Sequence, residues 1–120
     1  MPARVVVVHD ETDFSDRAVT ALGFAGYDVV AFADPMAALN ALDTAERVEV
    51  LITRVEFEPG KINGVALALM ARTKRPGIKV VFAALPEFEH HAAGLGEFMP
   101  APVRVSELVE TVRQLLTSAG

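Results

Sequence analysis

Short apolar segments alternate with amphipathic segments along the whole chain, and this alternation limits the possible folds more than any single motif. The short segments are rich in β-branched and aromatic residues, as strands buried on both faces of a sheet are. We expect strands at 4–8, 28–32, 49–53, 78–83 and 97–99, and helices at 13–25, 35–45, 64–74, 86–93 and 105–116. Five alternations of strand and helix predict an α/β fold, a doubly wound five-stranded parallel sheet with helices on both faces.

Capping residues and apolar spacing give specific expectations for two of the helices. We expect Asp13 to cap the first helix and Gly26 to end it. The buried face of the first helix is expected to comprise Phe14, Ala18, Leu22 and Ala25. The buried face of the third is expected to comprise Val65, Leu69 and Met70.

Composition excludes several classes of function. A chain of 120 residues with 52% hydrophobic residues is long enough for one domain with a core. The net charge of −5 argues against non-specific nucleic-acid binding, and the absence of cysteine excludes thiol chemistry. The apolar run at 5–8 is too short for a signal peptide or a membrane span, so we expect a cytoplasmic protein.

The predicted topology places the candidate site before any motif is considered. In open parallel sheets, ligands bind beyond the carboxyl ends of the strands. The residues expected there are His9, Asp10, Glu11, Arg54, Ala84 and Ala101. The site hypothesis therefore rests on strand ends that are distant in sequence and adjacent in the sheet.

Three short motifs add a family resemblance to this pattern. They are Val-Val-His-Asp-Glu at 7–11, Pro-Gly followed by Asn-Gly within 59–64, and Pro-Ala-Pro-Val at 100–103. In order and spacing, the whole chain resembles the receiver (CheY-like) domain of bacterial two-component response regulators. The resemblance implies a flavodoxin-like fold with strand order 2-1-3-4-5 and a single receiver-like domain over 1–120.

The chain departs from the family at the positions that carry its chemistry. Where the family has two acidic residues that hold Mg²⁺, this chain has His9 and Asp10, with Glu11 beside them. Arg54 occupies the position of the phospho-accepting aspartate, and the loop after it is about two residues longer than usual. Arginine is a permanent cation, so it is no nucleophile and it repels Mg²⁺.

Two further positions have lost their functional groups. Ala84 stands where the family has the hydroxyl that bonds the phosphoryl group, and Ala101 stands where it has a lysine before proline. Phe98 occupies the aromatic switch position, and without the hydroxyl we expect it to keep one rotamer. The resemblance therefore implies a degenerate phosphorylation pocket with no catalytic residue, no metal and no cofactor.

Charge balance predicts that Arg54 lies within hydrogen-bonding range of Asp10 or Glu11, with a bidentate pair as one form of the contact. Other readings stay open: Arg54 could point to solvent, and His9 could be a metal ligand. The adjacent His90 and His91 are interpreted as an exposed pair.

The function predicted from these features is a phosphorylation-independent protein–protein interaction module in two-component signalling, without enzymatic activity. The expected partner is a signalling protein such as a histidine kinase, a phosphotransfer protein or an output protein; homodimer formation stays open. One alternative is a receiver phosphorylated at Glu56, Glu58 or Asp10. Another is a flavodoxin-fold protein that binds a small ligand. The chain either acts alone or is a fragment of a larger regulator.

The spacing also predicts an altered output face. The segment from Ala84 to Phe98 is about five residues shorter than the family's usual spacing, which removes more than one turn of the fourth helix. We expect a mobile stub of one or two turns. We expect partner binding to use the first helix, at Asp16 and Arg17, rather than Glu110 and Arg113 on the last helix.

Overall fold

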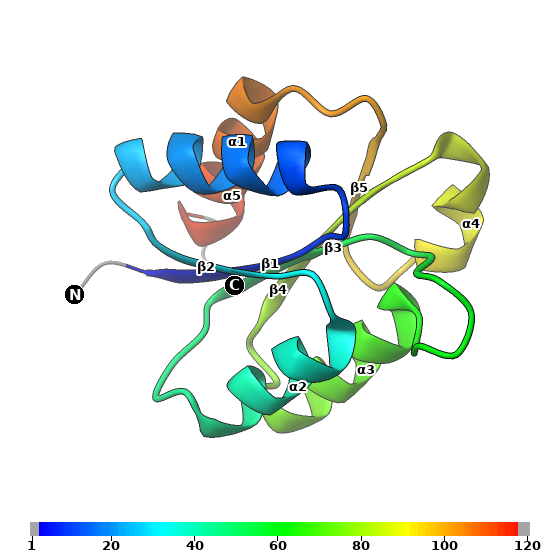
Figure 1. The fold of residues 1–120 in the computed structure, drawn as a ribbon. Coiled ribbons are helices and arrows are strands. Elements are labelled where there is room, and N and C mark those ends of the chain that lie inside the picture. The colour runs from blue at the N-terminus through cyan, green and yellow to red at the C-terminus, as the bar shows by residue number, and fades with distance from the viewer. Residues whose placement is uncertain (1–2, 118–120) are drawn as a thin grey trace.

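The computed structural model describes residues 3–117 and contains one five-stranded parallel sheet (Figure 1). The strands are β1 (Arg4–Val8), β2 (Asp28–Phe32), β3 (Val50–Thr53), β4 (Lys79–Ala84) and β5 (Glu97–Pro100). They lie in the order β2-β1-β3-β4-β5, and every neighbouring pair is parallel. The predicted flavodoxin-like strand order is therefore confirmed.

The helices cover both faces of the sheet, as predicted. They are α1 (Thr12–Phe24), α2 (Pro35–Thr44), α3 (Gly64–Lys74), the 3₁₀ turn η1 (Pro86–Phe88), α4 (Glu89–Ala92) and α5 (Val105–Thr117). Figure 1 shows α1 and α5 on one face, α2 and α3 on the other, and α4 at the side near β5. Within residues 3–117, none of the helices combines the length and apolar character needed to span a membrane.

The sheet separates two apolar layers, because successive strand residues point to opposite faces. Val6, Val8, Leu51 and Phe82 are among the residues that pack against α2 and α3. Val5, Val7, Ile52 and Val81 are among those that pack against α1 and α5. The central strands are thus buried on both faces, which explains their continuous apolar sequence.

Helix α1 differs in detail from its prediction. It begins at Thr12, so the N-cap is Glu11 and Asp13 lies in the first turn, where a carboxylate still favours the helix dipole. Gly26 has φ +100° and ends the helix as expected. Ala25 is exposed rather than buried, because the helix has already ended at Phe24.

Helix α3 is rotated relative to the predicted face. Its buried residues are Gly64, Leu67, Ala68 and Ala71, whereas Leu69 and Met70 are exposed by 49% and 40%. Val65 is only partly buried. Small residues at the contact let α3 lie close to the sheet. The packing gained by this close approach outweighs what burial of the larger Leu69 and Met70 side chains would contribute.

The loop between β3 and α3 is anchored to the core. Val55 and Phe57 are buried, with 5% and 8% of their surface exposed, and both join the layer under α2 and α3. Glu56 and Glu58 alternate with them and are exposed. The two glutamates therefore point away from the core.

The fourth helix is short, as predicted. After β4 the chain forms the single turn η1 and then the four residues of α4. Phe88 packs partly against the core, and Ala92 is the one buried residue of α4. The stub is held by few apolar contacts.

Candidate functional site

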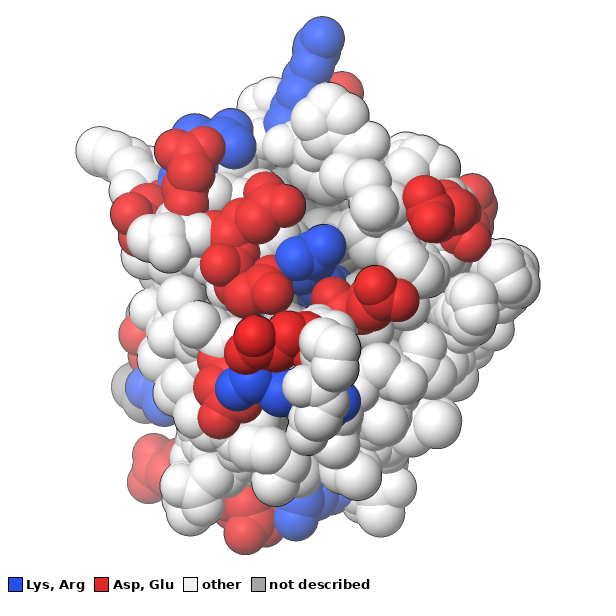
Figure 2. Space-filling view, turned by 45° about the vertical axis from the view of Figure 1, so that its right-hand side comes forward, with Lys and Arg blue, Asp and Glu red and all other residues white. Residues whose placement is uncertain are grey.

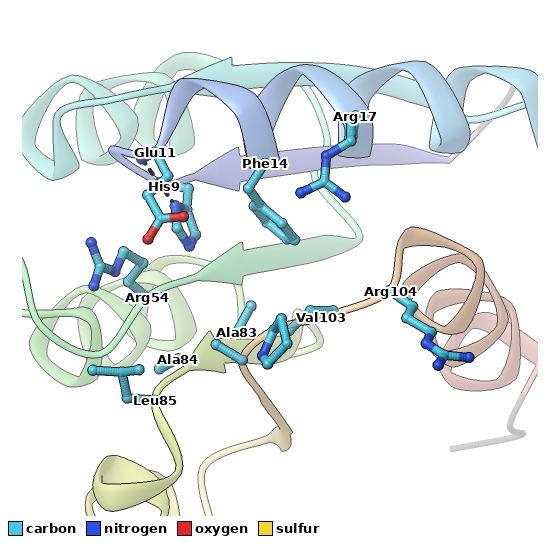
Figure 3. Close-up of a pocket in the computed structure, with 12 residues that line it drawn as sticks. His9, Glu11, Phe14, Arg17, Arg54, Ala83, Ala84, Leu85, Val103 and Arg104 are labelled. Atoms are coloured by element: carbon cyan, nitrogen blue, oxygen red, sulfur yellow. Dashed lines mark hydrogen bonds between the residues drawn. The ribbon is translucent and has the colours of Figure 1, made fainter.

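The carboxyl ends of β1, β3, β4 and β5 meet around a cavity of about 350 Å³. The parallel pairing of β1 with β3 and of β3 with β4 brings these ends together, as the topology predicted. The lining residues are His9, Glu11, Phe14, Arg17, Arg54, Ala83, Ala84, Leu85, Ala101, Pro102, Val103 and Arg104 (Figure 3). Five of the six predicted strand-end residues therefore line the cavity; Asp10 does not, but it contacts Arg54.

Arg54 forms an ion pair with Asp10 across the ends of β3 and β1. Its Nη1 donates a hydrogen bond to Asp10 Oδ1 at 2.5 Å, and the two side chains are 22% and 37% exposed. Burial raises the pKa of Asp10, but the hydrogen bond and charge of Arg54 outweigh it and lower the pKa overall. The predicted contact is confirmed as one hydrogen bond rather than a bidentate pair.

His9 is buried beneath this ion pair. It is 7% exposed, and its ring centroid lies 4.6 Å from that of Phe14. Burial, followed by the nearby charge of Arg54, lowers the pKa of His9 to about 4, although Asp10 and the Ala83 backbone act in the opposite direction. His9 is therefore neutral at neutral pH.

The ring nitrogen Nδ1 of His9 accepts a hydrogen bond from the backbone N–H of Glu11 at 3.2 Å. This bond fixes the turn that leads from β1 into α1. In a neutral ring, an accepting Nδ1 places the proton on Nε2, so neither nitrogen has a lone pair free for a metal. The geometry thus favours a structural role for His9.

The backbone at Arg54 is enclosed by its neighbours. The hydroxyl of Thr53 donates to the Arg54 carbonyl oxygen at 2.9 Å, and the Gly64 N–H donates to the Val55 carbonyl oxygen at 2.7 Å. A Cβ atom on Gly64 would lie 1.6 Å from the Arg54 carbonyl oxygen. Position 64 therefore requires glycine if α3 is to begin here.

Glu56 and Glu58 are not part of the cavity. Glu56 lines a separate hollow beside Phe88, and Glu58 lies 3.8 Å from Lys61. Lys61 also pairs with Asp34 at 3.0 Å, which ties the loop after β3 to the start of α2. Glu56 and Glu58, two of the alternative phosphorylation sites considered from the sequence, therefore lie outside the cavity.

Seven lining residues were not predicted as part of the site: Phe14, Arg17, Ala83, Leu85, Pro102, Val103 and Arg104. Phe14 was assigned to the core alone, although it lies three residues into α1 and so faces the strand ends. Arg104 directly follows the Pro-Ala-Pro-Val segment. In the sequence, Phe14 and Arg104 each lie close to a strand-end loop, and this proximity could have indicated that they line the site.

The remaining candidates lie outside the cavity. Phe98 is partly buried and packs against the layer under α2 and α3. His90 and His91 are exposed, with ring centroids 4.0 Å apart. Within residues 3–117, no group of three or more His, Cys, Asp or Glu side chains is arranged to hold a metal ion.

The surface around the site carries charges of both signs. Figure 2 shows acidic side chains surrounding a smaller basic group on the face that includes the strand ends. The ion pair of Arg54 with Asp10 belongs to this face. The edge of the sheet therefore has mixed charge rather than the acidic cluster that a divalent cation prefers.

Solved structures that are similar to this chain include several receiver domains. The receiver domain of the hybrid histidine kinase CckA is 29% identical over 96% of this chain and 100% of its own length, with a TM-score of 0.80. A CheY-like receiver domain protein from Methanospirillum hungatei JF-1 is 22% identical over 97% and 94%, with a TM-score of 0.85. A response regulator receiver protein from Sinorhizobium medicae WSM419 is 20% identical over 98% and 96%, with a TM-score of 0.87.

These similarities confirm the receiver-type fold. Neither a protein-family model nor a curated protein sequence matches the chain. The chemistry of the site is therefore argued from its own residues.

Proposed function

We propose that this chain is a receiver-like module of two-component signalling that binds partner proteins without being phosphorylated. One observation carries the proposal: Arg54 stands at the end of β3 and is engaged by Asp10. In the receiver family that the chain resembles, the phosphoryl acceptor stands at this strand end. A guanidinium cannot attack a phosphoryl group.

The surroundings of Arg54 support the same proposal. Ala84 and Ala101 line the cavity with methyl groups, so neither donates a hydrogen bond to a phosphoryl oxygen. Glu56 and Glu58 point away from the cavity, which weakens the alternative of phosphorylation at either one. Asp10 lies at the end of β1 rather than at the family's acceptor position on β3, and it is already hydrogen-bonded to Arg54, which weakens the alternative of phosphorylation there.

We propose further that the module is cytoplasmic, has no enzymatic activity and needs no cofactor. The Arg54 guanidinium neutralises Asp10, the carboxylate that would otherwise attract Mg²⁺. The partner class is a histidine kinase, a phosphotransfer protein or an output protein, and homodimer formation is part of the same hypothesis.

Helix α1 is the surface that we propose for the partner. Asp16 is exposed at the edge of a groove that continues to Val105 of α5, and Phe24 at the end of α1 is 90% exposed. Exposed aromatic side chains are enriched at interface surfaces. The shortened α4, in contrast, changes the shape of the surface near β5 (Figure 1).

The phosphorylation hypothesis is tested by incubation with acetyl phosphate or phosphoramidate and Mg²⁺, followed by intact-mass measurement. We expect no mass increase of one phosphoryl group. A stoichiometric adduct would refute the proposal. The variant Arg54→Asp should also stay largely unmodified, because Ala84 and Ala101 still lack the hydroxyl and the lysine.

The surface hypothesis is tested by pull-down of partner proteins with charge-reversal variants. Asp16→Lys on α1 should abolish binding, and Glu110→Lys on α5 serves as the matched control because both carboxylates are exposed on helices. If only Glu110→Lys loses binding, the interface lies on α5 and the hypothesis for α1 is wrong.

The alternative of a small-ligand-binding protein is favoured by a different observation, the cavity itself.

A further inference from the structure

Apolar side chains form a large part of the lining of the cavity at the strand ends. Phe14, Val103, Ala84 and Ala101 supply much of its wall, with Ala83, Leu85 and Pro102 beside them. At about 350 Å³ it lies at the small end of the range for ligand pockets, about 300–1,000 Å³. Larger side chains at the two strand-end alanines would fill part of this space.

The charged groups that line the cavity are mainly guanidinium groups. Arg17, Arg54 and Arg104 line it, whereas Glu11 is the one carboxylate that does so. Figure 3 shows Arg17 reaching from α1 toward Phe14, with Arg54 on the far side of His9. Guanidinium groups favour carboxylate or phosphate ligands over cations.

Most hydrogen-bond donors of these arginines are unused. Arg54 donates one bond to Asp10, and Arg17 Nε donates one bond to Asp13 at 3.2 Å. Within residues 3–117, the Arg104 guanidinium makes no hydrogen bond or ion pair with another side chain. A guanidinium has more N–H donors than one such contact occupies, so the cavity is rich in donors and poor in acceptors.

We propose that this cavity binds a small organic anion, an aromatic or branched aliphatic monocarboxylate. Its apolar body lies against Phe14 and Val103, and its carboxylate accepts hydrogen bonds from Arg17. The exposed Arg104 side chain, whose guanidinium points away from Phe14 in Figure 3, turns inward on binding and donates to the same carboxylate. The lining combines apolar and charged side chains, which suits a ligand with an apolar body and one anionic group, and the volume is too small for a nucleotide. The inference goes beyond partner binding and holds whether or not the chain is phosphorylated.

Benzoate is a suitable probe because it combines an apolar ring with one carboxylate. Titration into ¹⁵N-labelled protein should give saturable amide shifts that cluster at Glu11, Arg17, Val103 and Arg104. A probe of this size is expected to bind with a Kd in the high micromolar to millimolar range. Benzamide, the neutral isostere, should bind at least about tenfold more weakly, since it lacks the charge that the guanidinium groups recognise.

Three variants test the assignment. Arg17→Gln and Arg104→Gln should each weaken benzoate binding by about tenfold, in line with loss of one charge-assisted hydrogen bond. Arg113→Gln is the matched control, because Arg113 is also an exposed helical arginine paired with a carboxylate, Glu110, and lies outside the cavity. It should bind benzoate as the wild type does.

The variant Ala101→Leu fills the cavity and should abolish binding. Amide shifts remote from the cavity report whether this variant keeps its fold; if it does not, the two arginine variants decide the question. Inorganic phosphate, titrated in parallel, should produce much smaller shifts than benzoate.

Several results would overturn the proposal. These are the absence of saturable shifts with benzoate, equal affinity for benzamide, unchanged binding in both Arg17→Gln and Arg104→Gln, or undiminished binding in folded Ala101→Leu. Tighter binding of inorganic phosphate than of benzoate would overturn the assigned ligand class.

Discussion

The guanidinium of Arg54 and the carboxylate of Asp10 both keep contact with water, with 22% and 37% of the side chains exposed. Pairs of this kind are partly screened and contribute less than buried ones. Since the contact is one hydrogen bond, its energy depends on the geometry of a single N–H group. The pair is therefore expected to orient the strand ends more than to stabilise the whole fold.

A double-mutant cycle measures this contribution. Arg54→Gln and Asp10→Asn should each lower the free energy of unfolding by about 1 kcal/mol, with a coupling energy of about 0.5–1 kcal/mol. Urea unfolding of the two single variants and the double variant checks this. Coupling near zero would mean that the ion pair has no energetic role, and strong coupling would mean that water is excluded more fully than the exposed fractions indicate.

The sequence predicted the contact of Arg54 with Asp10 but could not predict its form. Parallel topology and charge balance were enough to bring the two residues together. The single hydrogen bond depends on rotamers, and the burial of His9 against Phe14 depends on the exact start of α1. Neither is encoded in a local pattern.

Among the elements, strands were easier to predict than helix faces. The three central strands are largely buried on both faces and form nearly continuous apolar runs, and all five strands agree with their predicted ranges to within about one residue. Helix α3 has apolar residues around most of its circumference, so spacing could not select its buried face. Contact between Gly64 and the backbone of Arg54 selects it instead.

Replacement of Gly64 should therefore disrupt the start of α3. In Gly64→Ala the new methyl group would overlap the Arg54 carbonyl oxygen, and we expect a loss of about 3 kcal/mol or more in the free energy of unfolding. Gly77→Ala is the matched control, because nothing lies within 4 Å of a Cβ placed there. Chemical denaturation of both variants tests the difference; equal stability would show that α3 shifts without penalty.

The shortened α4 should open more readily than the other helices. Its four residues include one buried side chain, whereas α1 buries four residues over thirteen. Short helices with little packing are marginal in water. In hydrogen–deuterium exchange, residues 86–92 should exchange at least about tenfold faster than the middle of α1, and comparable protection would contradict the prediction.

For the molecule as a whole, His9 sets a dependence of stability on acid. Its folded pKa is about 4 and its ordinary value is 6.5, so the unfolded chain takes up the proton first as pH falls. The stabilisation is complete above about pH 6.5 and is lost progressively between there and about pH 4. The loss amounts to at most about 3 kcal/mol.

The pKa of Asp10 is also lowered, so its pairing with Arg54 contributes stability above the ordinary Asp pKa of 3.8 and loses it below that value. The two groups thus act in separate pH ranges. Asp10 has no part in the loss expected in mildly acid solution.

Replacement of His9 should flatten this dependence. In His9→Asn a side-chain oxygen can still accept the Glu11 N–H, and the free energy of unfolding should change little between about pH 7 and pH 5. The paired variant His90→Asn with His91→Asn should keep the wild-type slope, since both side chains are exposed. A slope that persists in His9→Asn would assign the effect to other groups.

The short link between β4 and β5 also has a consequence for chain entropy. The link comprises the twelve residues 85–96, and restoring about five more would raise the entropy lost on closing the loop by only about 0.3 kcal/mol. One turn of a packed helix contributes more than that, since a single buried leucine or valine stabilises by about 1.5–3 kcal/mol. The shorter link therefore brings no gain in stability. The same entropy difference would speed the pairing of β5 with β4 by less than about twofold, so the shorter link has little effect on folding rate either.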